Sequence, residues 1–254
     1  MIGIYFSGTG NSRYALESLL RELASDAPMF SIEDPGLPAH LDDHDEIVFS
    51  YPVQYSSTPK FLYDFVQSHQ AVWKGKKVFV IATMALFSGD GAGVLGRLLK
   101  RHGAQITGGL HLKMPDSIAD EKVLKRSAEK NAQLVEAAGR KIAKAAAEMK
   151  TGKYPQEGLG LLARMAGFLL QRLWFGHRTR RYSDRLKVDA ERCIGCSKCV
   201  RLCPTGNLAI EGKAAKGADR CTACYRCVNA CPRQAITLLG KHVIEQTAIE
   251  KHLR

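Results

Sequence analysis

The sequence predicts an α/β fold in its first 150 residues, followed by a small cysteine-rich α+β module. Two observations predict this division. Short, nearly continuous apolar segments alternate with helical segments up to residue 150, a pattern typical of a parallel sheet covered by helices on both faces. All eight cysteines lie between residues 193 and 231. We therefore expect a domain at residues 1–150, a basic and apolar connecting segment at 151–190, and a second domain at 191–254.

The first domain should be a doubly wound sheet of five parallel strands. It opens with an apolar strand over residues 1–6. Four more strands are expected at 28–32, 46–51, 77–83 and 104–113. The helices between and after them are expected near 11–24, 58–70, 92–102 and 120–150.

The turn between the first strand and the first helix reads Ser7-Gly8-Thr9-Gly10-Asn11-Ser12. Glycines let the backbone approach an anion, and the three hydroxyls can donate to phosphate oxygens at the positive end of the helix. The loop lacks the Gly-Lys-Ser/Thr of a Walker loop. It therefore favours a monophosphate that is bound by amides and hydroxyls.

The opening Tyr-Phe-Ser-Gly-Thr-Gly-Asn-Ser, together with the alternating elements, resembles the flavodoxin family over about residues 1–150. The resemblance implies strand order 2-1-3-4-5 and FMN at the carboxyl ends of the strands. Many members place a Trp in the loop after the third strand. This sequence has none there, so flavin stacking would fall to Tyr51, Tyr55 or Phe87.

In that family three loops hold the flavin. The phosphate would be bound by Ser7, Thr9, Gly10, Asn11 and Ser12. One side of the ring would be covered by Tyr51, Pro52, Val53, Gln54 and Tyr55. The other side would be covered by Thr83, Met84, Phe87, Ser88, Gly89, Asp90 and Gly91.

A G-x-G-x-x-G match at residues 91–96 is an alternative signal for a dinucleotide. The preceding strand is expected to end near Met84, so these glycines do not form its exit turn. We interpret them as helix-opening glycines beside the flavin ring.

The cysteines form two copies of one pattern, C-x2-C-x2-C-x3-C-P, starting at Cys193 and Cys221. A zinc ribbon pairs two C-x2-C hairpins and does not need this triplet. A disulfide framework is disfavoured because the chain is large and shows no signal peptide. For the same reason we expect a cytoplasmic protein.

The pattern resembles the bacterial two-cluster ferredoxins, in which the fourth cysteine of each run crosses to the other cluster. The resemblance implies two [4Fe–4S] clusters with the ligand sets Cys193, Cys196, Cys199, Cys231 and Cys221, Cys224, Cys227, Cys203. The repeat extends to apolar positions, because Leu208 matches Ile236 and Ile210 matches Leu238. Both halves should contribute to one small core.

The formal net charge of +12 lies almost entirely in the C-terminal part. Residues 1–150 carry 18 Lys/Arg against 17 Asp/Glu, and residues 151–254 carry 19 against 8. No recognition-helix or aromatic stacking pattern accompanies these charges, so we do not expect nucleic acid. A basic surface near the clusters favours redox protein partners with acidic surfaces.

The apolar stretch 158–175, with basic residues behind it, is too short and too often interrupted to cross a bilayer. We expect it to pack between the domains. A peripheral membrane contact through 158–181 and a partner-docking helix are alternatives that the sequence leaves open without favouring them.

The whole chain resembles a family of flavodoxin–ferredoxin fusion proteins, found chiefly in anaerobes. The resemblance implies electron transfer between FMN and two [4Fe–4S] clusters, coupling one- and two-electron carriers. A reductase of a quinone, a flavin or a metal complex is the alternative, and a redox-sensing interaction protein is a third reading. No motif identifies a catalytic residue, so an enzymatic activity stays open.

Overall fold

The computed structural model describes residues 1–123, 125–167 and 185–253. Among these residues, five parallel strands form one sheet in the order β2-β1-β3-β4-β5. The strands are β1 (Ile2–Tyr5), β2 (Met29–Ser31), β3 (Glu46–Pro52), β4 (Lys77–Met84) and β5 (Gln105–Lys113). The predicted fold class and strand order are confirmed.

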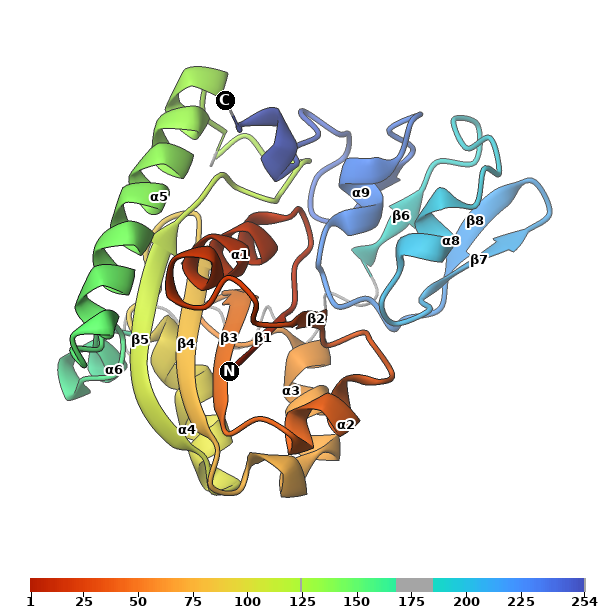
Figure 1. Ribbon diagram of the computed structural model, residues 1–254. Coiled ribbons are helices and arrows are strands. Elements are labelled where there is room, and N and C mark those ends of the chain that lie inside the picture. Colours follow the sequence, from red (N-terminus) through yellow and green to blue (C-terminus); the bar gives the residue numbers. More distant parts are fainter. Residues whose placement is uncertain (124, 168–184, 254) are drawn as a thin grey trace.

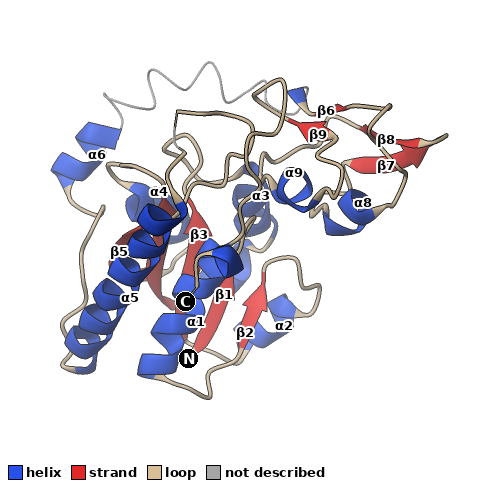
Figure 2. Ribbon diagram, turned by 90° about the horizontal axis from the view of Figure 1, so that it is seen from above, coloured by secondary structure: helices blue, strands red, loops and turns tan. Residues whose placement is uncertain are grey.

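Helices cover both faces of this sheet (Figure 2). On one face α1 (Asn11–Leu23) and α5 (Ala128–Lys150) pack against Val48, Phe79 and Ile81. The opposite face is covered by α2 (Leu37–Asp42), α3 (Lys60–Ser68), the short 3-10 helix η1 (Gln70–Trp73) and α4 (Gly91–Arg101). The strands are apolar on both sides because both sides are buried.

The last helix of this domain begins later than the sequence predicts, at Ala128 rather than near Asp120. Ser127 is its N-cap, and the Ser127 hydroxyl accepts a hydrogen bond from the Lys130 amide. Residues 114–123, which follow β5, form an extended connection (Figure 1). This connection contacts the C-terminal module, as described below.

The C-terminal module lies beside the carboxyl ends of the strands (Figure 1). It consists of β6 (Lys187–Val188), α8 (Lys198–Leu202), β7 (Leu208–Glu211), β8 (Ala214–Gly217), α9 (Arg226–Ala230), β9 (Ile236–Thr237) and the 3-10 helix η5 (Ile249–Lys251). β7 and β8 form an antiparallel hairpin, and β6 pairs with β9. The repeat is not buried evenly, because Leu238 is 4% exposed whereas its counterpart Ile210 is 37% exposed.

The connecting segment runs along the free edge of the sheet before it reaches α6 (Leu161–Gly167). The Gly109 amide donates to the Pro155 carbonyl (2.8 Å), and the Glu157 amide donates to the Gly109 carbonyl (2.9 Å). These bonds cover an edge strand that would otherwise offer unpaired amides and carbonyls to other chains.

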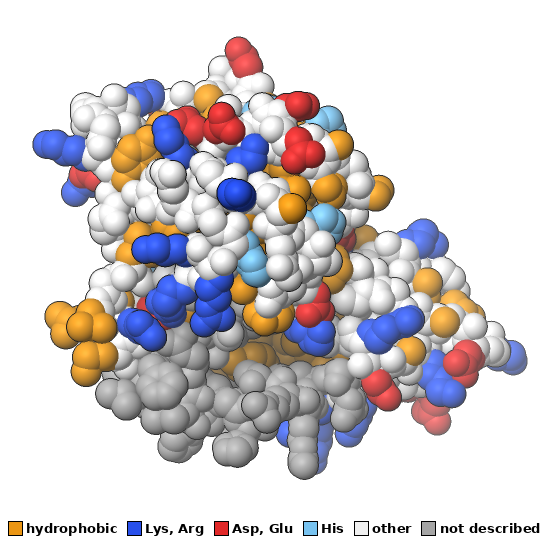
Figure 3. Space-filling view, turned by 90° about the horizontal axis from the view of Figure 1, so that it is seen from below, with side chains coloured by type: hydrophobic (Ala, Val, Ile, Leu, Met, Phe, Trp, Pro, Cys, Tyr) orange, Lys and Arg blue, Asp and Glu red, His pale blue; other side chains and the backbone are white. Residues whose placement is uncertain are grey.

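The prediction that residues 158–175 pack between the domains is wrong for most of α6. Leu159 packs against the core, but Leu161, Leu162 and Met165 on α6 are 69%, 82% and 49% exposed. Hydrophobic side chains gather at this corner of the molecule (Figure 3). Residues 168–175 lie outside the described part of the chain. Within that part, no helix is long and apolar enough to cross a membrane.

Asp120 joins the two domains through a buried carboxylate. One carboxylate oxygen accepts from the Tyr225 hydroxyl (2.9 Å), and the other accepts from the amides of Leu238 (2.6 Å) and Leu239 (2.9 Å). Asp120 is 3% exposed. A buried carboxylate is stable only when such donors replace the lost water.

Replacing Asp120 with Ala should therefore destabilise the protein, because three buried donors lose their acceptor. We expect a loss of about 3 kcal/mol or more in the free energy of unfolding. Anaerobic denaturant titration measures it. The exposed Asp43→Ala is the matched control and should stay within about 0.5 kcal/mol of the parent. Equal stability of both variants would show that Asp120 does not hold the domains together.

Candidate redox centres

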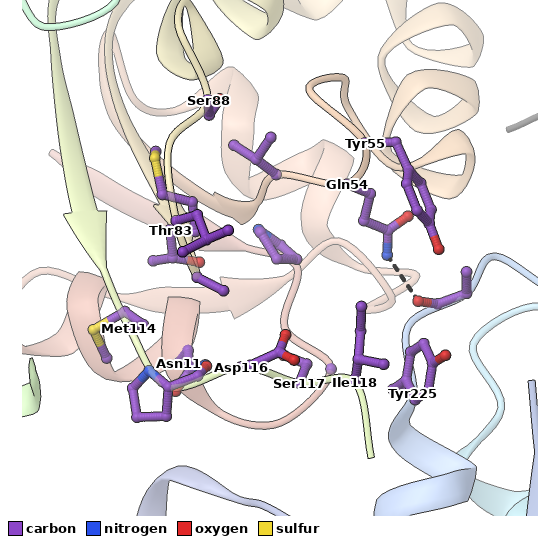
Figure 4. A pocket seen from close by; sticks show the side chains of 18 of the residues that line it. Asn11, Gln54, Tyr55, Thr83, Ser88, Met114, Asp116, Ser117, Ile118 and Tyr225 are labelled. Atoms are coloured by element: carbon purple, nitrogen blue, oxygen red, sulfur yellow. Dashed lines mark hydrogen bonds between the residues drawn. The ribbon is translucent and has the colours of Figure 1, made fainter. Parts of the chain in front are cut away.

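A cavity of about 450 Å³ lies at the carboxyl edge of the sheet. Its walls come from the loops that follow β1, β3, β4 and β5, and from residues 223–225 of the C-terminal module (Figure 4). Parallel strands place the loops after their carboxyl ends at one edge, which is where doubly wound sheets bind ligands. The volume is in the range of small-molecule and cofactor sites.

The structure brings many of the predicted flavin residues to this cavity. Its lining includes Asn11, Pro52, Val53, Gln54, Tyr55, Thr83, Met84, Phe87 and Ser88. Ser7, Thr9, Gly10 and Ser12 lie in the same first loop but do not line the cavity, and neither do Tyr51, Gly89, Asp90 and Gly91.

Tyr51 cannot stack on a ligand in this cavity. Its side chain is fully buried in the core, and its hydroxyl donates to the Gly91 carbonyl at 2.5 Å. Asp90 is also fully buried and pairs with Arg97. Stacking candidates at the cavity are therefore Tyr55 and the 57%-exposed Phe87.

Two of the three G-x-G-x-x-G glycines, Gly91 and Gly93, serve close packing of α4. A Cβ at Gly93 would lie 2.3 Å from the Gly158 carbonyl oxygen, so the connecting segment crosses the helix where no side chain fits. Gly91 lies against Ser88 and Val53 in the same way. This arrangement accounts for both glycines without a dinucleotide.

The first loop retains the features of an anion site. Gly10 precedes α1 with φ of 91°, and no described side chain caps the helix, so its first amides have no side-chain acceptor. The Thr9 hydroxyl pairs with the Ser117 hydroxyl (3.0 Å), and the Ser12 hydroxyl pairs with that of Thr83 (2.7 Å). In each pair one hydroxyl donates and the other accepts, so the accepting hydroxyl still has a proton to donate. The amides and hydroxyls are donors of the kind that bind a phosphate, although Thr9 and Ser12 are buried and only Gly8 and Asn11 of this turn line the cavity.

Two groups of cavity residues escaped the sequence analysis: 114–118, after β5, and 223–225, in the second cysteine run. Residues 114–118 share the edge of the other loops, and their position after a parallel strand was the one available signal. Nothing local in the sequence indicates that residues 223–225 reach the first domain.

Asp116 adds an acidic group to the cavity wall. Its Oδ2 atom is buried and has no hydrogen-bond partner among the described residues. Burial raises the pKa of this carboxyl, although amide hydrogen bonds and the charges of Lys125 and Arg126 oppose the shift. The carboxylate form is therefore held less well in the folded chain than in water.

The eight cysteines gather around two small cavities in the C-terminal module. One is lined by Cys193, Cys196, Cys199 and Cys231, and the other by Cys203, Cys221, Cys224 and Cys227. Each set takes three cysteines from one run and the last cysteine from the other. Each cavity is thus lined by the four residues of one expected ligand set, although among the described residues no three or more His, Cys, Asp or Glu side chains are arranged to hold a single metal ion. The ligand sets stay a prediction.

Backbone amides point at the sulfur atoms in a repeated way. The Asn207 amide donates to Cys203 Sγ (3.2 Å), and the Ala235 amide donates to Cys231 Sγ (3.3 Å), 28 residues further on. Burial raises the pKa of the Cys224 thiol to about 11. Such thiols become thiolates at neutral pH when a metal centre binds them.

Cys224 lines both the large cavity and the second cysteine cavity. Its carbonyl lies so close to the first loop that a Cβ on Gly8 would be 2.1 Å from the oxygen. Beside it, the Gln54 side chain donates to the Ala223 carbonyl (3.1 Å; Figure 4). Cys224 and Tyr225 line both cavities and so form part of the wall between the two sites.

Two family models match the chain. Residues 2–140 match a flavodoxin domain, and residues 186–238 match a 4Fe-4S dicluster domain. No curated protein matches.

Several solved structures are similar to the first domain. Flavodoxin 2 from Bacillus cereus is 17% identical over 59% of this chain and 97% of its own, with a TM-score of 0.44. The two-electron reduced flavodoxin of Megasphaera elsdenii is 23% identical over 57% and 100%, with a TM-score of 0.40. The Fusobacterium nucleatum flavodoxin bound to flavin mononucleotide is 15% identical over 60% and 98%, with a TM-score of 0.41.

The raised pKa of Asp116 predicts how Asp116→Asn changes stability with pH. The folded state keeps this proton to higher pH than the unfolded state, so ionisation costs stability as pH rises from the unfolded pKa through the folded one. The neutral Asn avoids this cost. We expect the variant to gain stability over the parent as pH rises above about 4, with no gain below it.

Anaerobic thermal unfolding of both proteins across this pH range measures the difference. Asp43→Asn, at an exposed position, is the control and should follow the parent at every pH. A gain of the same size at all pH values would mean that packing, rather than charge, separates Asn from Asp at position 116.

Proposed function

Because the chain belongs to the flavodoxin domain family and carries a 4Fe-4S dicluster domain in the same polypeptide, we propose that it relays electrons between FMN and two [4Fe–4S] clusters. The two domains by themselves establish an electron-transfer role with FMN and iron–sulfur clusters. The proposal adds the number of clusters, the internal route and its order.

The position of Cys224 carries this proposal. It lines the cavity that we assign to FMN and also the cavity of the second cysteine set. A cluster held by Cys203, Cys221, Cys224 and Cys227 would therefore lie next to the flavin. Because electron transfer slows steeply with distance, this cluster would exchange electrons with FMN directly.

The other cysteine set completes the route. Helices α8 and α9 pack against each other, and Cys199 and Cys227 belong to the same buried core. The proposed order is the cluster of Cys193, Cys196, Cys199 and Cys231, then the cluster beside Cys224, then FMN. When bound, FMN supplies a centre that holds one or two electrons, whereas each cluster passes one.

The protein's own residues would position the flavin and exclude water from it. Amides at the start of α1 would hold the phosphate, and the loops after β3 and β4 would cover the ring. The third wall, residues 223–225, comes from the C-terminal module. This contact of the C-terminal module with the cavity favours the relay over the reductase alternative.

An ion pair keeps the proposed centres together. The Arg226 guanidinium donates to both oxygens of Glu33 at 2.7 Å, to the Ser7 carbonyl (2.8 Å) and to the Leu202 carbonyl (3.1 Å). Its side chain is 19% exposed and that of Glu33 is 25% exposed. Bidentate pairing of this kind fixes orientation as well as distance.

We further propose a cytoplasmic location and redox protein partners with acidic surfaces.

Glu33→Ala tests the relay without touching a cysteine or the cavity. Losing the bidentate pair should weaken the contact between the domains by about 1.5–3 kcal/mol. Rapid mixing with a chemical reductant, followed at cluster and flavin wavelengths, should show slower equilibration between the two. Glu17→Ala, which removes an exposed pair with Arg21, is the control. A flavin that is reduced independently of the clusters in the parent protein would contradict the relay.

Cys199→Ala and Cys203→Ala test the ligand sets. They are neighbours in sequence but line different cavities, so we expect the first change to damage one cluster and the second change the other. Iron analysis of the parent should give about eight irons per chain. Anaerobic paramagnetic resonance distinguishes the clusters. Loss of the same signal in both variants would contradict the crossing of the fourth cysteine.

A further inference from the structure

The internal repeat places two related loops on the C-terminal module. Residues 194–198 read Ile-Gly-Cys-Ser-Lys, and 28 positions later residues 222–226 read Thr-Ala-Cys-Tyr-Arg. Ser197 and Tyr225 both precede a short helix with φ near 60°. The two loops therefore have the same backbone conformation at this point, and each carries a cysteine of a different set.

The second loop shows how such a loop docks on another redox domain. The Phe61 amide donates to the Thr222 hydroxyl (3.4 Å), and Gln54 donates to the Ala223 carbonyl. The Cys224 carbonyl lies against Gly8, in the turn that we assign to the flavin phosphate. Thus a glycine-containing cofactor loop packs directly on the main chain of a cluster-binding cysteine.

Charge completes this interface. Arg226 ends the second loop and binds Glu33, an acidic residue of the flavodoxin domain. Lys198 is its counterpart in the first loop, so the positive charge at this position is kept. In the second loop, Arg226 therefore pairs with a carboxylate, Glu33, that lies next to the first βα turn of the flavodoxin domain.

The first loop has the same features but no partner domain among the described residues. Ile194 is 61% exposed, and both Cys196 and Lys198 are exposed, whereas Thr222 is 7% exposed. Ile194 and Lys198 line the first cysteine cavity together with Ile210 and Arg233. This part of the module, with the β7–β8 hairpin, projects away from the sheet in both ribbon views (Figures 1 and 2).

We propose that residues 194–198 form the docking site of a separate, acidic electron-transfer protein. Its cofactor loop would pack on the main chain at Cys196 as the Gly8 loop packs on Cys224, and one of its carboxylates would pair with Lys198. In each encounter the partner's cofactor loses one electron and the cluster of Cys193, Cys196, Cys199 and Cys231 gains it. No proton is transferred, and no covalent bond forms or breaks.

The chemistry of the surface restricts the partner. Residues 185–238 carry ten Lys/Arg and four Asp/Glu, so an acidic surface is attracted and a second copy of this chain, with a formal charge of +12, is repelled. The exposed Ile194 and Ile210 add a small apolar centre inside the basic rim, which is the usual composition of a transient interface. This inference deepens the proposed function by placing the entry point of the electrons.

Lys198→Glu tests the site, with an isolated acidic flavodoxin, chemically reduced, as the probe. Anaerobic stopped-flow bleaching of the clusters gives the second-order rate constant. We expect Lys198→Glu to lower this constant roughly tenfold at low salt, and the difference to shrink as salt is added. Reduced methyl viologen, which needs no docking surface, should reduce the clusters of both proteins at equal rates.

Lys150→Glu, at an exposed position on the far helix α5, is the matched control for net charge. If it slows the flavodoxin reaction as much as Lys198→Glu does, the docking site is wrong. Carbodiimide coupling followed by peptide mapping should join Lys198 to a carboxylate of the probe, and coupling only elsewhere would also overturn the proposal. If the clusters bleach at the normal rate but the FMN of this chain is not reduced, the relay is contradicted and the docking site is not, because docking is measured at the clusters.

Discussion

The structure depends on a main-chain contact between two domains. The Cys224 carbonyl meets the first βα turn at Gly8, where no side chain fits between them. Arg226 fixes this contact from one side through Glu33, and Asp120 fixes it from the other through Tyr225. Both anchors are neighbours of Cys224 in sequence or in space. The shared wall of the large cavity and the proposed route from the cysteine sites to the flavin both depend on this contact.

The two halves of the cysteine repeat have diverged in their surroundings more than in their backbones. Leu238 is covered by the connection around Asp120, whereas Ile210, its counterpart, lies on the outer hairpin. A free ferredoxin module could expose both ends to partners. Here one end is used by the chain itself, so the module has one inward and one outward face.

Much of the fold could be predicted from local patterns. Apolar strands, the hydroxyl-rich turn and the cysteine spacing indicated both domains, and the predicted strand order is confirmed. The sequence predicts helix for the end of the connection after β5, because residues 120–127 offer no clear break before Ser127. Asp120 and Tyr225 are not predicted as site residues for a different reason. Their roles arise from contacts between residues more than 100 positions apart, which no local pattern records.

The shared cavity wall also has a thermodynamic consequence. Because residues 223–225 form part of the cavity, any ligand that contacts them binds more tightly when the domains are docked. By reciprocity, the same ligand strengthens the docking by an equal free energy. Since metal centres organise the cysteine loops, damage to the neighbouring cluster by an oxidant would loosen this wall. In the proposed arrangement, loss of iron would therefore weaken the binding of the flavin, so the affinities for the two cofactors would be coupled.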